Sequence, residues 1–76
     1  MKISELDTIV LEEDLPKYGL RRGDIGAVVA IYSPDDFEVE FVTASGHTQA
    51  LIHLGKRQVR AVEPHDIPAV RSLDAA

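Results

Sequence analysis

The chain has 76 residues, with 45% hydrophobic and 28% charged side chains, the size and mixture of one small globular domain. Thirteen acidic residues against eight lysines and arginines give a net charge of −5. This charge excludes a protein whose whole surface binds nucleic acid or an anionic membrane. The absence of cysteine excludes a disulfide framework, a thiolate nucleophile and a zinc ribbon.

The length of the chain also bears on its function class and location. No apolar run approaches the roughly 20 residues that a membrane-spanning helix needs, and residues 1–5 lack the apolar stretch of a signal peptide. We therefore expect a cytoplasmic protein that does not associate with membranes. A core this small leaves little volume for a deep catalytic pocket, since ligand sites occupy roughly 300–1,000 Å³. The size favours a non-catalytic binding module that needs no cofactor.

Two β-type runs occupy the first part of the chain. Residues 7–12 are β-branched in the middle, and residues 26–32 are strongly apolar without a helical cap. The second run predicts a central strand that is buried on much of both faces. Residues 15–24 form the connector between them, in which Gly19 and Gly23 permit positive φ. We expect Leu15 and Leu20 to anchor this connector to the core.

A hairpin is predicted in the second half. Residues 37–41 alternate between apolar side chains and glutamates, which is typical of a strand with one buried face. Residues 49–54 place Ala50, Ile52 and Leu54 on one side in the same way. The two runs are joined by the turn residues 43–46, so we expect them to pair.

The remaining residues complete the predicted fold. Residues 55–58 are expected to turn the chain into a short last strand at 59–62, and Pro64 and Pro68 break any further ladder. We therefore predict an all-β, five-stranded SH3-like barrel over residues 1–63. A short C-terminal tail, residues 64–76, is expected to fray. An OB-fold is the rival, but the chain has no room for its usual helix.

Several segments resemble one bacterial family. They comprise the first strand, the acids that follow it, the run Gly23-Asp24-Ile25-Gly26-Ala27-Val28, Glu38-Val39-Glu40-Phe41 and Thr48-x-Ala50-Leu51. Together they are similar to a domain of unknown function, number 4926, over roughly residues 6–63. The resemblance implies an SH3-like fold. The Gly23–Val28 segment is by itself similar to small barrels of the KOW and SH3-like type, which implies that Gly23 and Gly26 shape a turn capped by Asp24. Weaker similarities are to KOW-type barrels and to the barrel of the nitrile hydratase β subunit. No catalytic residue is implied by any of them.

Acidic and histidine side chains are the candidates for metal binding. The acids gather at residues 12–14, at 35–36 and at positions 38 and 40, but their spacing matches no calcium loop. His47, His53 and His65 form no helical pair. We interpret these residues as solvated surface groups and predict no metal site.

The first long connector carries the candidate binding residues. SH3-like barrels often bind partners beside this loop, and here it holds an aromatic residue, two arginines and two acids. The predicted partner-binding residues are Glu13, Asp14, Tyr18, Arg21 and Arg22. The expected partner is another protein, which this acidic chain would regulate, neutralise or complete as an accessory subunit. An exposed Leu51 would mark a further partner or dimer edge.

A basic patch near the C-terminus supports an alternative function. Lys56, Arg57 and Arg60 could contact a phosphate backbone, as in a KOW-like RNA contact. Against this alternative, the chain has few aromatic residues, so a stacking platform for bases would be thin.

Overall fold

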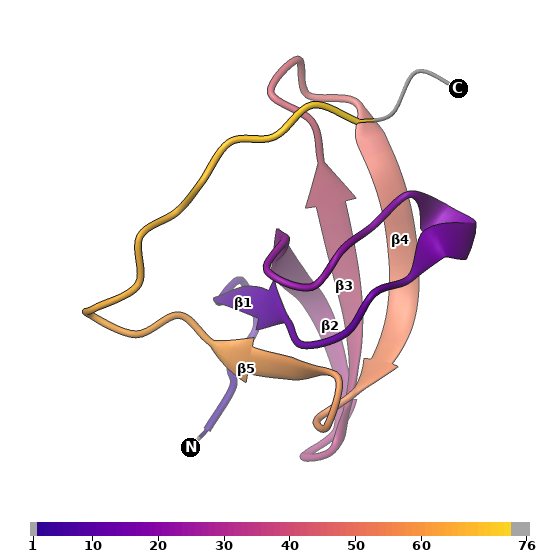
Figure 1. Cartoon of the computed structure of the whole chain (residues 1–76). Coiled ribbons are helices and arrows are strands. Elements are labelled where there is room, and N and C mark those ends of the chain that lie inside the picture. The colour runs from indigo at the N-terminus through magenta and orange to yellow at the C-terminus, as the bar shows by residue number, and fades with distance from the viewer. Residues whose placement is uncertain (1, 74–76) are drawn as a thin grey trace.

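The computed structural model describes residues 2–73, and within them the fold is all-β with a single 3₁₀ turn. Neighbouring strands are antiparallel in the order β4-β3-β2-β1-β5 (Figure 1). The elements are β1 (Thr8–Leu11), η1 (Pro16–Tyr18), β2 (Ile25–Ser33), β3 (Asp36–Val42), β4 (Thr48–Gly55) and β5 (Val59–Ala61).

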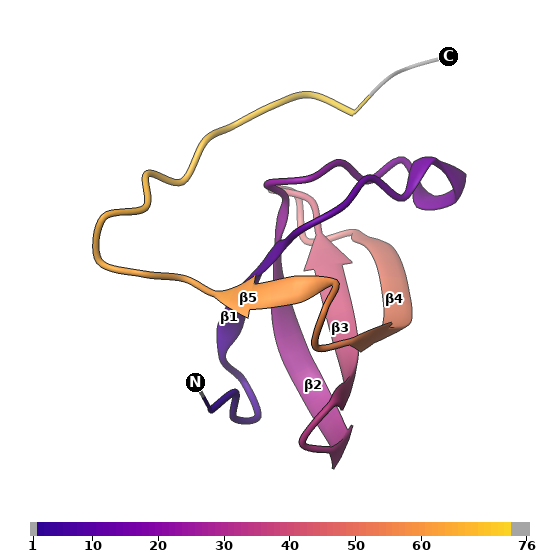
Figure 2. The same ribbon diagram turned by 60° about the horizontal axis from the view of Figure 1, so that its bottom comes forward.

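The sheet is strongly curved. Figures 1 and 2 show β5 crossing the direction of β3 and β4, with the two edge strands joined by the turn that follows β4. No ladder joins β4 to β5 within residues 2–73, so the sheet does not close. This strand order is compatible with the SH3-like barrel that the sequence indicates. No helix within the same residues has the length and apolar character to cross a membrane.

The core lies on the concave face of the sheet. The predicted hairpin is confirmed, because β3 pairs with β4 through Phe37 opposite Leu54, and Val39 opposite Ile52. Alternation buries Phe41 with these residues and places Glu38 and Leu51 on the opposite face of the sheet. The buried cluster comprises Ile3, Ile9, Leu11, Leu20, Val28, Phe37, Val39, Phe41, Ala50, Ile52, Leu54 and Val59.

The prediction that β2 is buried on both faces is wrong. Only Gly26 and Val28 of this strand are buried, while Val29, Ile31 and Tyr32 are exposed. Two irregularities in its pairing with β3 accompany this exposure. A single curved sheet covers one face of each strand, so an apolar run does not imply burial on both sides.

The two glycines of the Gly-Asp segment have different roles. Gly23 has a φ of 97° and lies in the turn before β2, as expected. Gly26 instead lies inside β2, where an added Cβ would be 2.8 Å from Val39 Cγ1 and 3.0 Å from the Glu40 carbonyl. Its predicted turn role is therefore wrong, because close packing of β2 on β3 is what excludes a side chain there.

Beyond β5, residues 62–73 form neither helix nor strand. Residues 63–66 form a turn that Asp66 stabilises, because its Oδ2 accepts a hydrogen bond from the Glu63 amide at 2.6 Å. The chain then runs back toward the loop between β1 and β2 (Figures 1 and 2). The rest of the expected tail, residues 74–76, lies outside the described residues.

Candidate functional site

The loop between β1 and β2, residues 12–24, is anchored in the core at its middle. Leu15 and Leu20 pair through two backbone hydrogen bonds of 2.9 and 3.1 Å, and Leu20 is only 4% exposed. Between them, η1 ends at Gly19, whose left-handed φ of 70° lets its amide reach the Pro16 carbonyl. The predicted anchoring by the two leucines is confirmed.

Side-chain hydrogen bonds tie the same loop to its surroundings. Asp14 Oδ1 accepts a hydrogen bond from the Arg22 amide at 2.8 Å, which closes the base of the loop. Gln49 Nε2, on β4, donates to the Tyr18 carbonyl at 3.0 Å. Glu13 Oε2 accepts from Gln58 Nε2 at 3.2 Å. The loop is therefore a fixed part of the fold.

All five predicted partner-binding residues lie on this loop. Tyr18 is half-buried against the core, with the Lys17 ammonium 5.6 Å from its ring centre. The other four are exposed, namely Glu13, Asp14, Arg21 and Arg22. The structure thus brings the predicted residues together on one loop.

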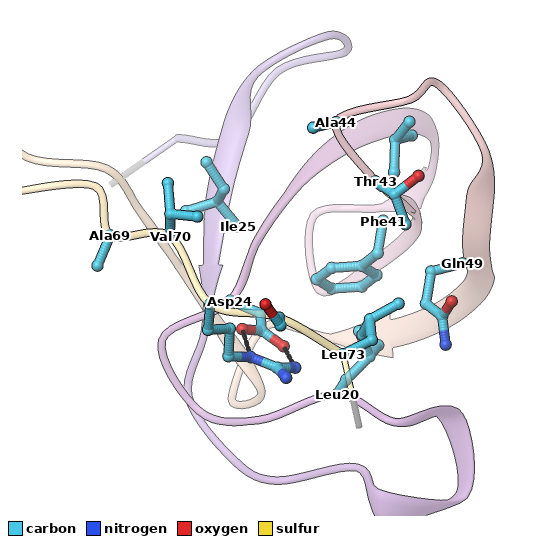
Figure 3. A pocket seen from close by; sticks show the side chains of 13 residues that line it. Leu20, Asp24, Ile25, Phe41, Thr43, Ala44, Gln49, Ala69, Val70 and Leu73 are labelled. Carbon is cyan, nitrogen blue, oxygen red and sulfur yellow. Dashed lines mark hydrogen bonds and ion pairs between the residues drawn. The ribbon is translucent and has the colours of Figure 1, made fainter. Parts of the chain in front are cut away.

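A groove of about 590 Å³ opens beside this loop. One wall carries Leu20 and Asp24 from the loop, and the opposite wall carries residues 41–44 from the end of β3 and the following turn. Residues 69–73 of the tail border the groove, with Leu73 at the same end as Leu20 (Figure 3). We refer to this feature as the tail groove.

Asp24 is the one carboxylate among the described residues that line the tail groove, and it forms an ion pair with Arg71, which also lines the groove. Its Oδ1 accepts a hydrogen bond from Arg71 Nε at 2.8 Å, and its Oδ2 accepts from Arg71 Nη2 at 2.5 Å (Figure 3). The Arg21 amide also donates to Oδ2, at 2.8 Å, which confirms the predicted turn cap. Burial raises the pKa of Asp24, but the hydrogen bonds from Arg71 and Arg21 outweigh it and lower that pKa overall.

The basic residues of the alternative RNA site have acidic neighbours. Arg60 donates to both carboxylate oxygens of Asp66, at 2.8 and 2.9 Å, and its Nε lies 3.5 Å from Glu12. These hydrogen bonds lower the pKa of Asp66 to about 2. Lys56 Nζ is 3.3 Å from an oxygen of Asp35. Arg57 is exposed in the turn after β4. Arg60 and Lys56, two of the three residues predicted to contact phosphate, therefore already lie beside carboxylates.

Polar side chains also meet on the convex face of the sheet. Ser33 Oγ donates to Asp36 Oδ2 at 3.0 Å, and His53 Nε2 is 3.1 Å from Asp36 Oδ1. Hydrogen bonds from Ser33 and His53 lower the pKa of Asp36. Asp36 thus stands between the serine and the histidine, whereas a nucleophilic serine needs the histidine as its own partner. This arrangement is not that of a hydrolase triad.

The candidate metal ligands stay dispersed. Within residues 2–73, no group of three or more histidine or acidic side chains is placed to hold a metal ion. Leu51, whose exposure the sequence left open, is 57% exposed on the convex face.

Sequence reasoning placed the binding surface beside this loop but did not identify the other residues that line the groove. It named neither Gln49 nor Ala44 as lining residues, and it placed Arg71 in a fraying tail. Arg71 and Asp24 are 47 positions apart, and no spacing or motif connects them. The one available signal is that Arg71 is the single lysine or arginine after residue 60.

The family model described as Domain of unknown function (DUF4926) matches residues 5–61. The match spans all five strands, the β1–β2 loop and the β3–β4 turn, whereas the tail that borders the groove lies outside it. A search of curated proteins and a search of solved structures each found no match.

Proposed function

The chain belongs to the DUF4926 family of domains of unknown function, and we propose that it is a non-catalytic module that binds a protein partner through the tail groove. The proposal places this module in the bacterial cytoplasm. It also includes the loop residues Glu13, Asp14, Tyr18, Arg21 and Arg22 as the rim of the binding surface. Binding of this chain would regulate or neutralise the partner, or complete it as an accessory subunit.

The groove is the main observation that supports this proposal. Its volume of about 590 Å³ falls within the range of ligand-binding pockets. Exposed apolar side chains such as Ile25 and Val42 line it, together with the single carboxylate of Asp24 and the guanidinium of Arg71. An apolar surface beside a carboxylate that pairs with a guanidinium is typical of sites that hold a peptide side chain.

The rigidity of one wall supports the same function. The loop is fixed by the Leu15–Leu20 pairing and by the hydrogen bond from Gln49 to Tyr18. A wall that is ordered before binding lowers the entropy cost of association. Interface backbones of this kind usually move little when a partner binds.

The charge of Asp24 suits the binding of a basic partner better than it suits proton transfer in catalysis. Its lowered pKa keeps it a carboxylate at neutral pH, whereas a general base works best with a pKa near the working pH. The net charge of −5 would steer a basic partner surface toward the chain. A basic protein segment is therefore the partner that the site suits best.

The test is capture of the partner by tagged full-length protein from lysate of its host. Ala44→Arg places a long cation at the wall of the groove, while His47→Arg places the same side chain elsewhere on the same exposed turn. We expect wild type and His47→Arg to retain one protein in fixed stoichiometry, and Ala44→Arg to lose it. Circular dichroism of each variant verifies folding.

Two outcomes would contradict the proposal. A partner that Ala44→Arg retains fully would place the binding surface away from the groove. A capture that disappears after nuclease treatment, and that weakens steeply with salt or with Arg57→Glu, would favour the alternative RNA contact.

A further inference from the structure

The tail is seated on the groove by few contacts. Ile67 is 89% exposed and Val70 is fully exposed, so these two apolar side chains bury almost no surface against the barrel. The polar contacts described between residues 67–73 and the barrel are made by Arg71. A segment seated in this way contributes little hydrophobic stabilisation of its own.

Arg71 is held by groups that belong to the loop. Besides the two hydrogen bonds to Asp24, its Nη2 donates to the Gly19 carbonyl at 2.9 Å. A carboxylate that accepts two parallel hydrogen bonds, with a carbonyl beside it, matches the planar donor fork of a guanidinium. The groove thus contains an arginine-binding site.

This arginine-binding site is ordered by contacts that do not involve the tail. The Asp24 carboxylate is oriented by the Arg21 amide, and the Asp24 carbonyl accepts a hydrogen bond from the Leu11 amide at 2.8 Å. The Gly19 carbonyl is positioned by the left-handed end of η1. The site also lies within the residues that match the family, while Arg71 lies outside them.

We propose that the tail occupies the site of a partner segment. That partner segment is an extended stretch in which an arginine is followed two residues later by an apolar side chain. The partner's arginine would displace Arg71 from Asp24 and Gly19, and its apolar residue would take the place of Leu73. This inference rests on the proposed protein-binding function and specifies the chemistry of the segment that is bound.

Leu73 supplies the apolar half of the pattern. Its side chain is 39% exposed, much less than those of Ile67 and Val70, and it borders the groove at the Leu20 end (Figure 3). A partner segment competes with a tethered tail, whose effective concentration is high. The weak seating of the tail is what would make such competition feasible.

The experiment uses full-length protein and a synthetic peptide of residues 66–76 as the probe. In Arg71→Gln protein the tail loses its guanidinium, so the labelled peptide can occupy the site in trans. We expect this variant to bind the peptide at least about tenfold more tightly than wild type, whose own tail competes. Fluorescence polarisation measures the affinities, and amide NMR shifts at Leu20 and Ala44 report the place of binding.

Matched controls test the arginine itself. A peptide with lysine at the position of Arg71 keeps the charge but lacks the fork, and we expect it to bind several-fold more weakly. Adding Asp24→Asn to Arg71→Gln keeps an acceptor for the Arg21 amide, and we expect it to abolish peptide binding. Equal binding of the peptide by wild type and Arg71→Gln, or of the arginine and lysine peptides, would overturn the inference.

The outcomes also separate this inference from the proposed function. If the peptide fails to bind while Ala44→Arg still abolishes capture of the partner, the binding function stands and the arginine chemistry is wrong. If the peptide binds as expected while Ala44→Arg leaves capture unchanged, the partner does not use the groove. Both proposals would then be wrong, and the contact would serve only the chain's own tail.

Discussion

Two irregular segments border the tail groove, and they differ in how they are attached. The loop of residues 12–24 places Leu20 in the core and is closed by backbone pairing between Leu15 and Leu20. The tail of residues 62–73 has a similar length, but Ile67 and Val70 point into solvent. Neither segment forms a strand, yet of the two only the loop places a side chain in the buried core.

This difference shows that the lack of secondary structure is a poor guide to local stability. Buried contacts and satisfied backbone groups decide how easily a segment opens. The loop has both, and it carries the ordered groups that bind Arg71. Beyond Asp66, which Arg60 binds at the start of the tail, the one described polar anchor of the tail is Arg71. A fixed receptor opposite a weakly seated segment is the arrangement that allows exchange of one ligand for another.

Replacing the buried anchor of the loop should have the largest effect. Leu20→Ala removes a side chain that is 4% exposed, and we expect the free energy of unfolding to fall by about 2–4 kcal/mol. Val70→Ala shortens a fully exposed tail residue, and we expect a change within about 0.5 kcal/mol. Urea denaturation measures both. Similar losses from the two substitutions would show that the tail packs as closely as the loop.

Changing the backbone at the end of η1 should have an intermediate effect. Gly19→Ala forces a side chain into a left-handed conformation with φ of 70° and places its Cβ 3.2 Å from Gln49 Nε2. We expect a loss of about 1–2 kcal/mol in the free energy of unfolding. Asparagine tolerates this conformation better, so Gly19→Asn should cost less. Thermal denaturation compares the two, and an alanine variant as stable as wild type would contradict the strain argument.

The strands were predictable from local patterns. Alternation in residues 37–41 and 49–54 determines which face is buried, and a shift of one residue would expose the whole apolar set. The burial of β2 was not predictable in this way, because an apolar run does not show whether a second layer covers it. The role of Gly26 depends on Val39, which approaches it from a neighbouring strand.

The site was predictable only in part. The connector was identified from its glycines and its two leucines, and its position beside a groove follows from the expected fold. The opposite wall at Ala44 and the contact of Arg71 with Asp24 depend on how distant segments meet in space. A single ion pair between positions 47 residues apart leaves no periodicity or spacing in the sequence.

The smallest expected effect is a pH dependence of the contact that seats the tail. Folding lowers the pKa of Asp24 from its ordinary value of 3.8, so the stability that its carboxylate contributes is complete above that value. This contribution is lost as the pH falls through the lower folded pKa, when Asp24 is protonated and Arg71 loses its acceptor. We expect the amide NMR shifts of residues 69–73 to change over the same acidic range.

Carboxyl-carbon NMR titration of wild type and Arg71→Gln tests this prediction. Burial alone raises the pKa of Asp24, so removal of the guanidinium should move its titration midpoint upward. Asp66 is the internal control, because its pKa of about 2 is due to Arg60 and the Glu63 amide and should stay unchanged. If Asp24 titrates at the same pH in both proteins, Arg71 does not hold the tail in solution. The tail would then be attached by other contacts, and the contrast between loop and tail would no longer rest on this ion pair.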